Sequence, residues 1–147
     1  MNLSDRTQIE GLIFRYARFV DTAQWEDLGR LFTAARITAN KTDRVLAGAE
    51  EIGNYWKATN KQYDNGTLCT HHVVTNLEFE DLPDGQIRVR SAFTVFQATP
   101  KLPLQPIACG RYLDVFDQVD GVWRFRSKHI DVTLIGEMSQ HLNIEIT

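Results

Sequence analysis

The sequence has little cysteine and no long hydrophobic run. Its two cysteines, Cys69 and Cys109, are too few for a disulfide framework and lack the spacing of metal ligands. No apolar stretch approaches the ~18 residues of a membrane span. Residues 1–10 also lack the apolar segment of a signal peptide. We therefore expect a reduced, cytoplasmic protein with no membrane association.

Basic stripes and nucleotide-binding motifs are absent as well. The net charge is −3 with acids and bases interspersed, which does not suit nucleic-acid binding. The sequence contains no glycine-rich phosphate-binding motif and no GxSxG nucleophile motif. The four histidines, His71, His72, His129 and His141, form no HxH or HExxH pattern. We expect no nucleic-acid partner, no metal and no cofactor.

The size and the periodicity predict one α+β domain. The chain has 147 residues, enough for one domain with one core, so we treat residues 1–147 as a single domain. The N-terminal part has a helical period, and from residue 67 the apolar period becomes two. Helices followed by long antiparallel strands indicate a curved, cone-shaped antiparallel sheet packed against the N-terminal helices.

The predicted elements have these bounds. Helices are expected at 4–21, from residue 25 for about three turns, and at 48–63. Strands are expected at 34–39, 44–47, 67–82, 86–99, 107–119 and 122–135. The segments 83–85 and 120–121 are hairpin signals, whereas the proline-rich 100–106 predicts a looser loop.

The first helix ends in an acid. Its apolar face is formed by Ile9, Leu12, Ile13, Tyr16, Ala17 and Val20. Ser4 is its predicted N-cap, and Asp21 lies in its last turn. A carboxylate there faces the negative end of the helix dipole, which raises its pKa and suits a base. Asp21 could equally cap the second helix, with Gln24 in the capping-box position. Both interpretations stay open.

Two adjacent histidines lie in the first long strand, where successive residues point to opposite faces. Alternation groups His71 with Val73, Leu77 and Phe79, and so predicts that His71 is the inward residue. His129 could line a cavity in the last strand, whereas His141 is expected to be solvated in the C-terminal tail. A structural or surface role stays open for each histidine.

Three ordered stretches, RYARFVDTAQWEDLGRLF, THHVVTNLEFE and CGRYLDVFDQVDGVWRF, together resemble the SnoaL-like branch of the NTF2-like superfamily. That branch includes scytalone dehydratase, the bile-acid dehydratases and hexachlorocyclohexane dehydrochlorinase. The resemblance extends from about residue 9 to 135. It implies a cone-shaped α+β barrel with a deep apolar pocket.

The resemblance also implies roles for particular residues. In the lyase members, an aspartate at the end of the first helix orients a strand histidine that abstracts a proton. These roles fall on Asp21 and His72, and a pocket tyrosine falls on Tyr16. Scytalone dehydratase also has a second histidine on the neighbouring strand and a tyrosine just before the aspartate. Here the corresponding strand SAFTVFQAT contains no histidine, and Val20 precedes Asp21. These two departures argue against a scytalone-type dehydration.

A small hydrophobic ligand is the expected partner, in a concave apolar space between sheet and helices. The residues expected at its wall are Trp25, Tyr55, Trp56, Phe93, Phe96 and His129. Arg111 joins them if it points inward, where it would need a counter-charge such as Asp21.

The sequence supports two functional hypotheses. The first is a cofactor-independent lyase or isomerase acting on a small steroid-like or polyketide-like ring compound, with His72 as base, Asp21 as its partner and Tyr16 as a donor. The alternative is a non-catalytic binding or assembly subunit, similar to the small subunits of ring-hydroxylating dioxygenases, since fold does not settle function.

Assembly is expected from the strands. One layer of helices cannot cover both faces of the sheet. Apolar residues nevertheless occupy both odd and even positions of the strands, and they include Val89, Val95, Val115, Ile130 and Val132. We expect a homodimer through the sheet, with a homotrimer as the alternative.

Overall fold

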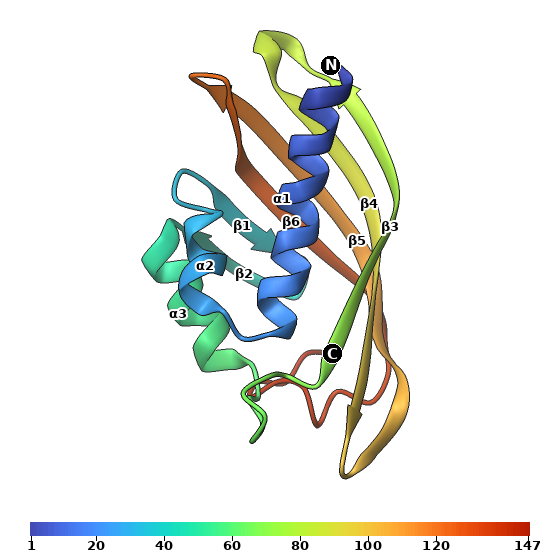
Figure 1. The fold of residues 1–147 in the computed structure, drawn as a ribbon. Helices are drawn as coiled ribbons and strands as arrows, with labels where there is room; N and C mark the ends of the chain where they lie inside the picture. The colour runs from blue at the N-terminus through green and yellow to red at the C-terminus, as the bar shows by residue number, and fades with distance from the viewer.

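The computed structural model describes residues 1–147 and contains three α-helices and one six-stranded sheet (Figure 1). The helices are α1 (Leu3–Asp21), α2 (Trp25–Arg30) and α3 (Ala49–Thr59). The strands are β1 (Arg36–Ala39), β2 (Thr42–Ala47), β3 (Thr70–Asp81), β4 (Ile87–Thr99), β5 (Leu102–Val119) and β6 (Val122–Ile135). Their order is β2-β1-β6-β5-β4-β3, antiparallel except for the β1–β6 pair. The predicted α+β class is confirmed.

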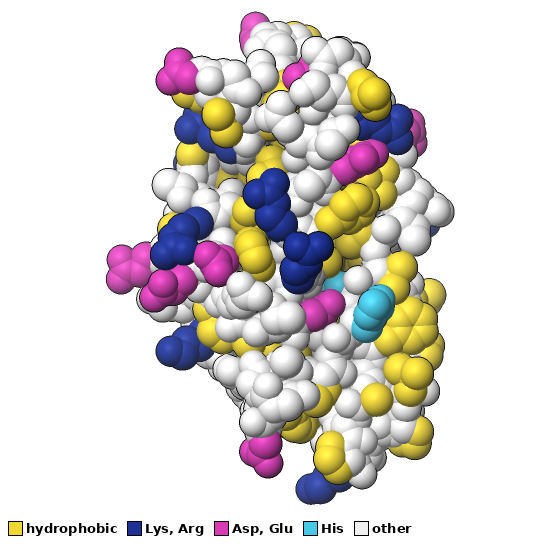
Figure 2. Space-filling view, in the orientation of Figure 1, with side chains coloured by type: hydrophobic (Ala, Val, Ile, Leu, Met, Phe, Trp, Pro, Cys, Tyr) yellow, Lys and Arg dark blue, Asp and Glu magenta, His cyan; other side chains and the backbone are white.

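The three helices lie on the same side of the curved sheet. Helix α1 crosses the sheet and packs against β3 and β6, while α2 and α3 pack on each other beside β1 and β2 (Figure 1). All six residues of the predicted apolar face of α1 are buried. Basic side chains gather over the opposite face of this helix (Figure 2), where Arg15 and Arg18 are exposed. No helix is both long and apolar enough to cross a membrane.

The N-cap of helix α1 is Asn2, two residues before the predicted cap. The side chain of Asn2 accepts a hydrogen bond from the backbone N–H of Asp5, and Asp5 accepts one from the N–H of Asn2. This reciprocal capping box satisfies two N–H groups at the start of the helix. The prediction of Ser4 as the N-cap was therefore wrong.

The other two helices are shorter than predicted. Helix α2 has only six residues, and the chain turns at Leu31 and Phe32 instead of continuing the helix. Helix α3 ends at Thr59 because Asn60 is extended and forms a β-bridge with Leu142. Leu142 belongs to the C-terminal segment, residues 136–147, which follows β6. Pairing with a distant part of the chain thus overrides the local helical period.

The proline-rich segment is part of a strand, contrary to the predicted loop. Strand β5 begins at Leu102, directly after the turn at Pro100 and Lys101. The β5–β6 ladder begins only at Ala108, so residues 102–106 have β4 as their one neighbouring strand. Prolines are tolerated in such a segment, because it is paired on one side only and fewer ladder hydrogen bonds need an N–H donor.

A buried ion pair lies in the core beneath two aromatic rings. Lys128 Nζ is 3.2 and 3.4 Å from the two carboxylate oxygens of Asp114, and both side chains are fully buried. Burial raises the pKa of Asp114 and lowers that of Lys128, and their mutual attraction opposes both effects. Lys128 Nζ also lies 3.4 Å from the ring centroid of Tyr112 and 4.3 Å from that of Tyr16. The ammonium group therefore helps to hold these two rings in place.

Candidate active site

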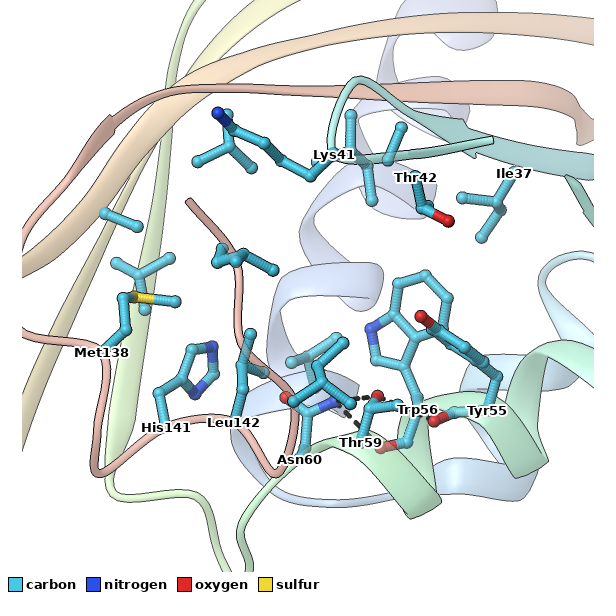
Figure 3. A pocket seen from close by; sticks show the side chains of 18 of the residues that line it. Ile37, Lys41, Thr42, Tyr55, Trp56, Thr59, Asn60, Met138, His141 and Leu142 are labelled. Atoms are coloured by element: carbon cyan, nitrogen blue, oxygen red, sulfur yellow. Dashed lines mark hydrogen bonds between the residues drawn. The ribbon is translucent and has the colours of Figure 1, made fainter. Parts of the chain in front are cut away.

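The structure encloses an apolar cavity of about 340 Å³ between α1, α3, the sheet and the C-terminal segment (Figure 3). Tyr55 and Trp56 of α3 face Met138, His141 and Leu142 of the C-terminal segment across it. Its apolar wall also includes Val20, Ile37, Leu46, Phe93, Val95, Ala108, Ile130 and Val132. This volume falls in the range of small-molecule sites.

The cavity wall carries few charged side chains. The lysine, arginine and glutamate side chains among the lining residues are all solvent-exposed: Lys41, Arg44 and Glu145. The interior is therefore suited to an uncharged ring compound, with polar groups contributed mainly by tyrosine and histidine.

Asp21 is held at the end of α1 by the start of β3. Its carboxylate accepts hydrogen bonds from Thr70 Oγ1 at 2.8 Å and from the backbone N–H of His72 at 2.9 Å. It also lies 2.5 Å from His72 Nδ1. The N-cap of α2 is Gln24, without a side-chain capping bond. The carboxylate is thus committed to β3, which rules out the alternative that Asp21 caps the second helix.

The electrostatics of this pair favour an ionised carboxylate. Burial raises the pKa of Asp21, but the hydrogen bonds and charge of His72, together with Thr70, outweigh burial and lower the pKa below its ordinary value of 3.8. A carboxylate on Nδ1 selects the tautomer in which that nitrogen carries the proton. His72 Nε2 is then free as an acceptor.

His72, rather than His71, lines the cavity. Only 7% of the His72 side chain is exposed, whereas His71 is exposed at the surface. Alternation failed because the β3–β4 register shifts between Thr75 and Glu78, with Asn76 at φ +57°. A bulge adds one residue and so exchanges the faces of the residues on its two sides. The apolar Leu77 and Phe79 therefore do not share a face with His71.

Tyr16 also lines the cavity and is buried. Its ring makes edge-on contacts with Phe32 and Tyr112, at centroid distances of 5.9 and 5.8 Å. Burial, followed by the charge of Asp114, raises the pKa of Tyr16 far above its usual range. The hydroxyl is consequently protonated at any physiological pH and can donate a hydrogen bond.

Three of the residues predicted for the wall do line the cavity: Tyr55, Trp56 and Phe93. Phe93 stacks on Tyr112 with the ring centroids 4.3 Å apart. Trp25 does not reach the cavity, because at the start of α2 it packs against α3, with its backbone carbonyl beside Gly53.

The other three predicted residues also lie away from the cavity. Phe96 pairs with His71, outside the inward set of β4. Arg111 is exposed because it alternates with the buried Gly110 and Tyr112 of β5. His129 does not line the cavity, and its Nδ1 lies 2.7 Å from the hydroxyl oxygen of Thr38.

Sequence reasoning missed the contribution of the C-terminal segment. His141, predicted to be solvated, is 6% exposed and lines the cavity with its ring centroid 6.3 Å from that of His72. Burial and the nearby His72 lower its pKa to about 3, so the imidazole is neutral near pH 7. Leu142, Ile144 and Ile146 also line the cavity, and their alternation along the sequence was a signal that this segment packs against the rest of the protein.

The arrangement can support proton transfer within an apolar enclosure. It provides one imidazole oriented by a carboxylate, a second neutral imidazole and a protonated tyrosine. No three His, Cys, Asp or Glu side chains converge as a metal site requires.

Known proteins resemble this chain in sequence pattern and in fold. The model of a family described as a SnoaL-like domain matches residues 1–129, which confirms the resemblance seen in the sequence. No match was found among curated protein sequences. A proposed scytalone dehydratase from Novosphingobium aromaticivorans is 21% identical with a TM-score of 0.70, over 90% of this chain and 87% of that chain.

Two further solved structures are similar at lower identity. LinA is 18% identical with a TM-score of 0.72, over 99% of this chain and 95% of that chain. A proposed aromatic ring hydroxylase from Novosphingobium aromaticivorans is 16% identical with a TM-score of 0.74, over 95% of this chain and 98% of that chain. At these identities the likeness shows the shared fold.

Proposed function

Because the chain belongs to the SnoaL-like family of the NTF2-like superfamily, we propose that it is a cofactor-independent lyase or isomerase acting on a small hydrophobic ring compound, steroid-like or polyketide-like. The observation that carries this proposal is the hydrogen-bonded pair of Asp21 and His72 at the wall of an apolar cavity. A buried carboxylate–imidazole pair facing a ligand-sized cavity is a common arrangement for general-base catalysis.

The proposed first step is removal of a proton from a carbon next to a carbonyl group. His72 Nε2 takes the proton, and the electron pair of the C–H bond moves into an enolate. Asp21 stabilises the imidazolium that forms. The Tyr16 hydroxyl donates a hydrogen bond to the oxygen that becomes negative, in a site from which most water is excluded.

The second step differs between the two reactions. In an isomerase, His72 returns the proton to another carbon of the enolate. In a dehydrating lyase, the electron pair expels a hydroxyl group from the next carbon, and the proton of His72 converts the departing hydroxide to water. Protons balance in both cases, so no cofactor is needed.

Ligands can be found by screening steroids and aromatic polyketides for a rise in melting temperature. Tryptophan fluorescence then tests whether a hit occupies the cavity, because Trp56 lines it and Trp25 does not. We expect the change in fluorescence to survive Trp25→Phe and to disappear in Trp56→Phe.

Turnover of such a compound tests the proposal. His72→Ala and Asp21→Asn are each expected to lose activity by roughly 10²–10⁴-fold, the usual contribution of general-base catalysis, without unfolding. The double variant should lose little more than either single variant, because the two residues act as a unit. His71→Ala, an exposed neighbour, is the matched control. Full activity in both His72→Ala and Asp21→Asn would refute the assignment.

The alternative is a binding or assembly subunit without chemistry of its own. The likeness to a proposed aromatic ring hydroxylase motivates it. Ligands that bind in the cavity but are never turned over by the wild-type chain would favour this alternative.

A further inference from the structure

The C-terminal segment is fixed in place by hydrogen bonds from distant parts of the chain. Lys61 Nζ donates to the carbonyl of Ser139 at 2.6 Å, and Gln97 Nε2 donates to that of Gln140 at 2.9 Å. The backbone N–H of Lys61 donates to the carbonyl of His141 at 2.9 Å. The adjoining backbone therefore sets the position of the His141 side chain without any bond from its ring.

The His141 ring has no hydrogen-bond partner in the protein. Its Nδ1 is completely buried and unpartnered, and Nε2 makes no hydrogen bond to a protein group. Buried polar atoms in folded proteins are nearly always hydrogen-bonded, and a buried one without a partner is costly. Two neighbouring polar side chains at the wall are satisfied, since Thr59 and Asn60 donate to the carbonyls of Tyr55 and Trp56.

His72 and His141 differ in what they have left to offer. His72 uses Nδ1 for Asp21 and retains one nitrogen toward the cavity. His141 is a neutral imidazole, with one N–H donor and one acceptor, and neither is used. The ring centroids are 6.3 Å apart, so one small substrate can contact both rings.

We infer that His141 is a second catalytic residue, which hydrogen-bonds a hydroxyl or carbonyl oxygen of the ring substrate while His72 removes the proton from carbon. This inference rests on the proposed function and narrows the substrate class to ring compounds that carry such an oxygen near the acidic C–H. The nitrogen that meets the substrate is Nε2, because Nδ1 is completely enclosed by protein. A purely hydrocarbon ligand leaves Nε2 without a hydrogen bond and therefore binds less tightly than a ligand that carries the oxygen.

The test uses two ligands that differ in one group. 2-Naphthol and 2-methylnaphthalene have nearly the same shape, but only the first has a hydroxyl. Their dissociation constants are measured by ligand-observed NMR on the full-length wild-type chain, on His141→Leu and on His71→Leu. Wild type and His71→Leu should bind 2-naphthol about tenfold more tightly than 2-methylnaphthalene, the scale of one hydrogen bond to a buried group.

In His141→Leu the preference for 2-naphthol should disappear while 2-methylnaphthalene still binds. A merely structural role of His141 would weaken both ligands alike and leave their ratio unchanged. A preference that persists in His141→Leu, or a wild-type chain that does not prefer 2-naphthol, overturns the inference.

A second measurement does not depend on the fold of a variant. In wild-type protein with ¹⁵N-labelled histidine, 2-naphthol should shift a ring-nitrogen resonance of His141 but not those of the exposed His71. An unchanged His141 signal in the presence of bound 2-naphthol overturns the inference.

The two proposals fail separately. Turnover lost in His72→Ala but hydroxyl preference unchanged in His141→Leu would sink the inference on His141 alone. A hydroxyl preference that depends on His141, together with full activity in His72→Ala and Asp21→Asn, would instead sink the proton-transfer proposal.

Discussion

At the scale of single residues, burial of His141 should be visible as acid sensitivity. Its pKa is about 3 in the folded chain against an ordinary value of 6.5, because burial and, next, His72 disfavour its charged form, while Asp21 partly opposes them. Between these two values the unfolded chain binds more protons than the folded chain, so stability falls as the pH falls. We expect His141 to account for a loss of about 2 kcal/mol between pH 7 and pH 5.

Denaturant unfolding at both pH values measures this loss. His141→Gln should lose about 2 kcal/mol less than wild type on acidification, while the exposed His71→Gln should behave as wild type. Asp21 acts in a lower window, because its pKa lies below 3.8 and its contribution is lost only as the pH falls through that folded-state value. Equal losses in wild type and His141→Gln would contradict the expectation.

At the scale of elements, two helical glycines should respond oppositely to alanine. A methyl group on Gly11 of α1 would meet only the flexible end of Arg15, at 3.2 Å. Gly11→Ala should therefore stabilise the fold by up to about 1 kcal/mol, through reduced chain entropy in the unfolded state. A methyl group on Gly53 of α3 would lie 2.8 Å from the backbone carbonyl oxygen of Trp25.

Because rigid backbone leaves no room for that methyl group, Gly53→Ala should force α2 and α3 apart and cost about 1–3 kcal/mol. Chemical denaturation of both variants measures the two effects against wild type. A gain in stability at Gly53 would show that the packing of α2 on α3 is looser than the structure indicates.

At the scale of the whole molecule, we propose that two copies associate through the outer face of the sheet. Most of the valines that suggested this contact in the sequence do not lie on the outer face of the sheet. Val89 and Val95 are buried, and Val132 lines the cavity. On the outer face of the sheet, the exposed apolar side chains include Leu113 of β5 and Leu134 of β6, which are 38% and 66% exposed. A second copy that covers these two leucines would remove their apolar surface from water.

Light scattering at micromolar concentration tests this assembly. Wild type should have the mass of a dimer, and Leu134→Glu should shift it toward a monomer because a charge would be buried at the contact. Val45→Glu, on the exposed face of β2, is the control and should leave the mass unchanged. A monomeric wild-type chain would contradict the proposal, and a trimer would favour the other assembly.

Local sequence was sufficient for the features that depend on spacing between neighbours. The buried face of α1 follows from a helical repeat, and the hairpin at Asp120 and Gly121 follows from two residues that tolerate positive φ, observed at 51° and 79°. The pairing of Asp21 with His72 was accessible only through family resemblance, since 51 positions separate the two residues.

Tertiary structure decided which side chains meet in the cavity. The bulge at Asn76 reverses the faces of β3, so alternation alone selected His71 instead of His72. His141 reaches the cavity because bonds from Lys61 and Gln97 hold a segment that looks like a free tail in the sequence. Both outcomes depend on backbone pairing between segments far apart in the chain, which local periodicity does not record.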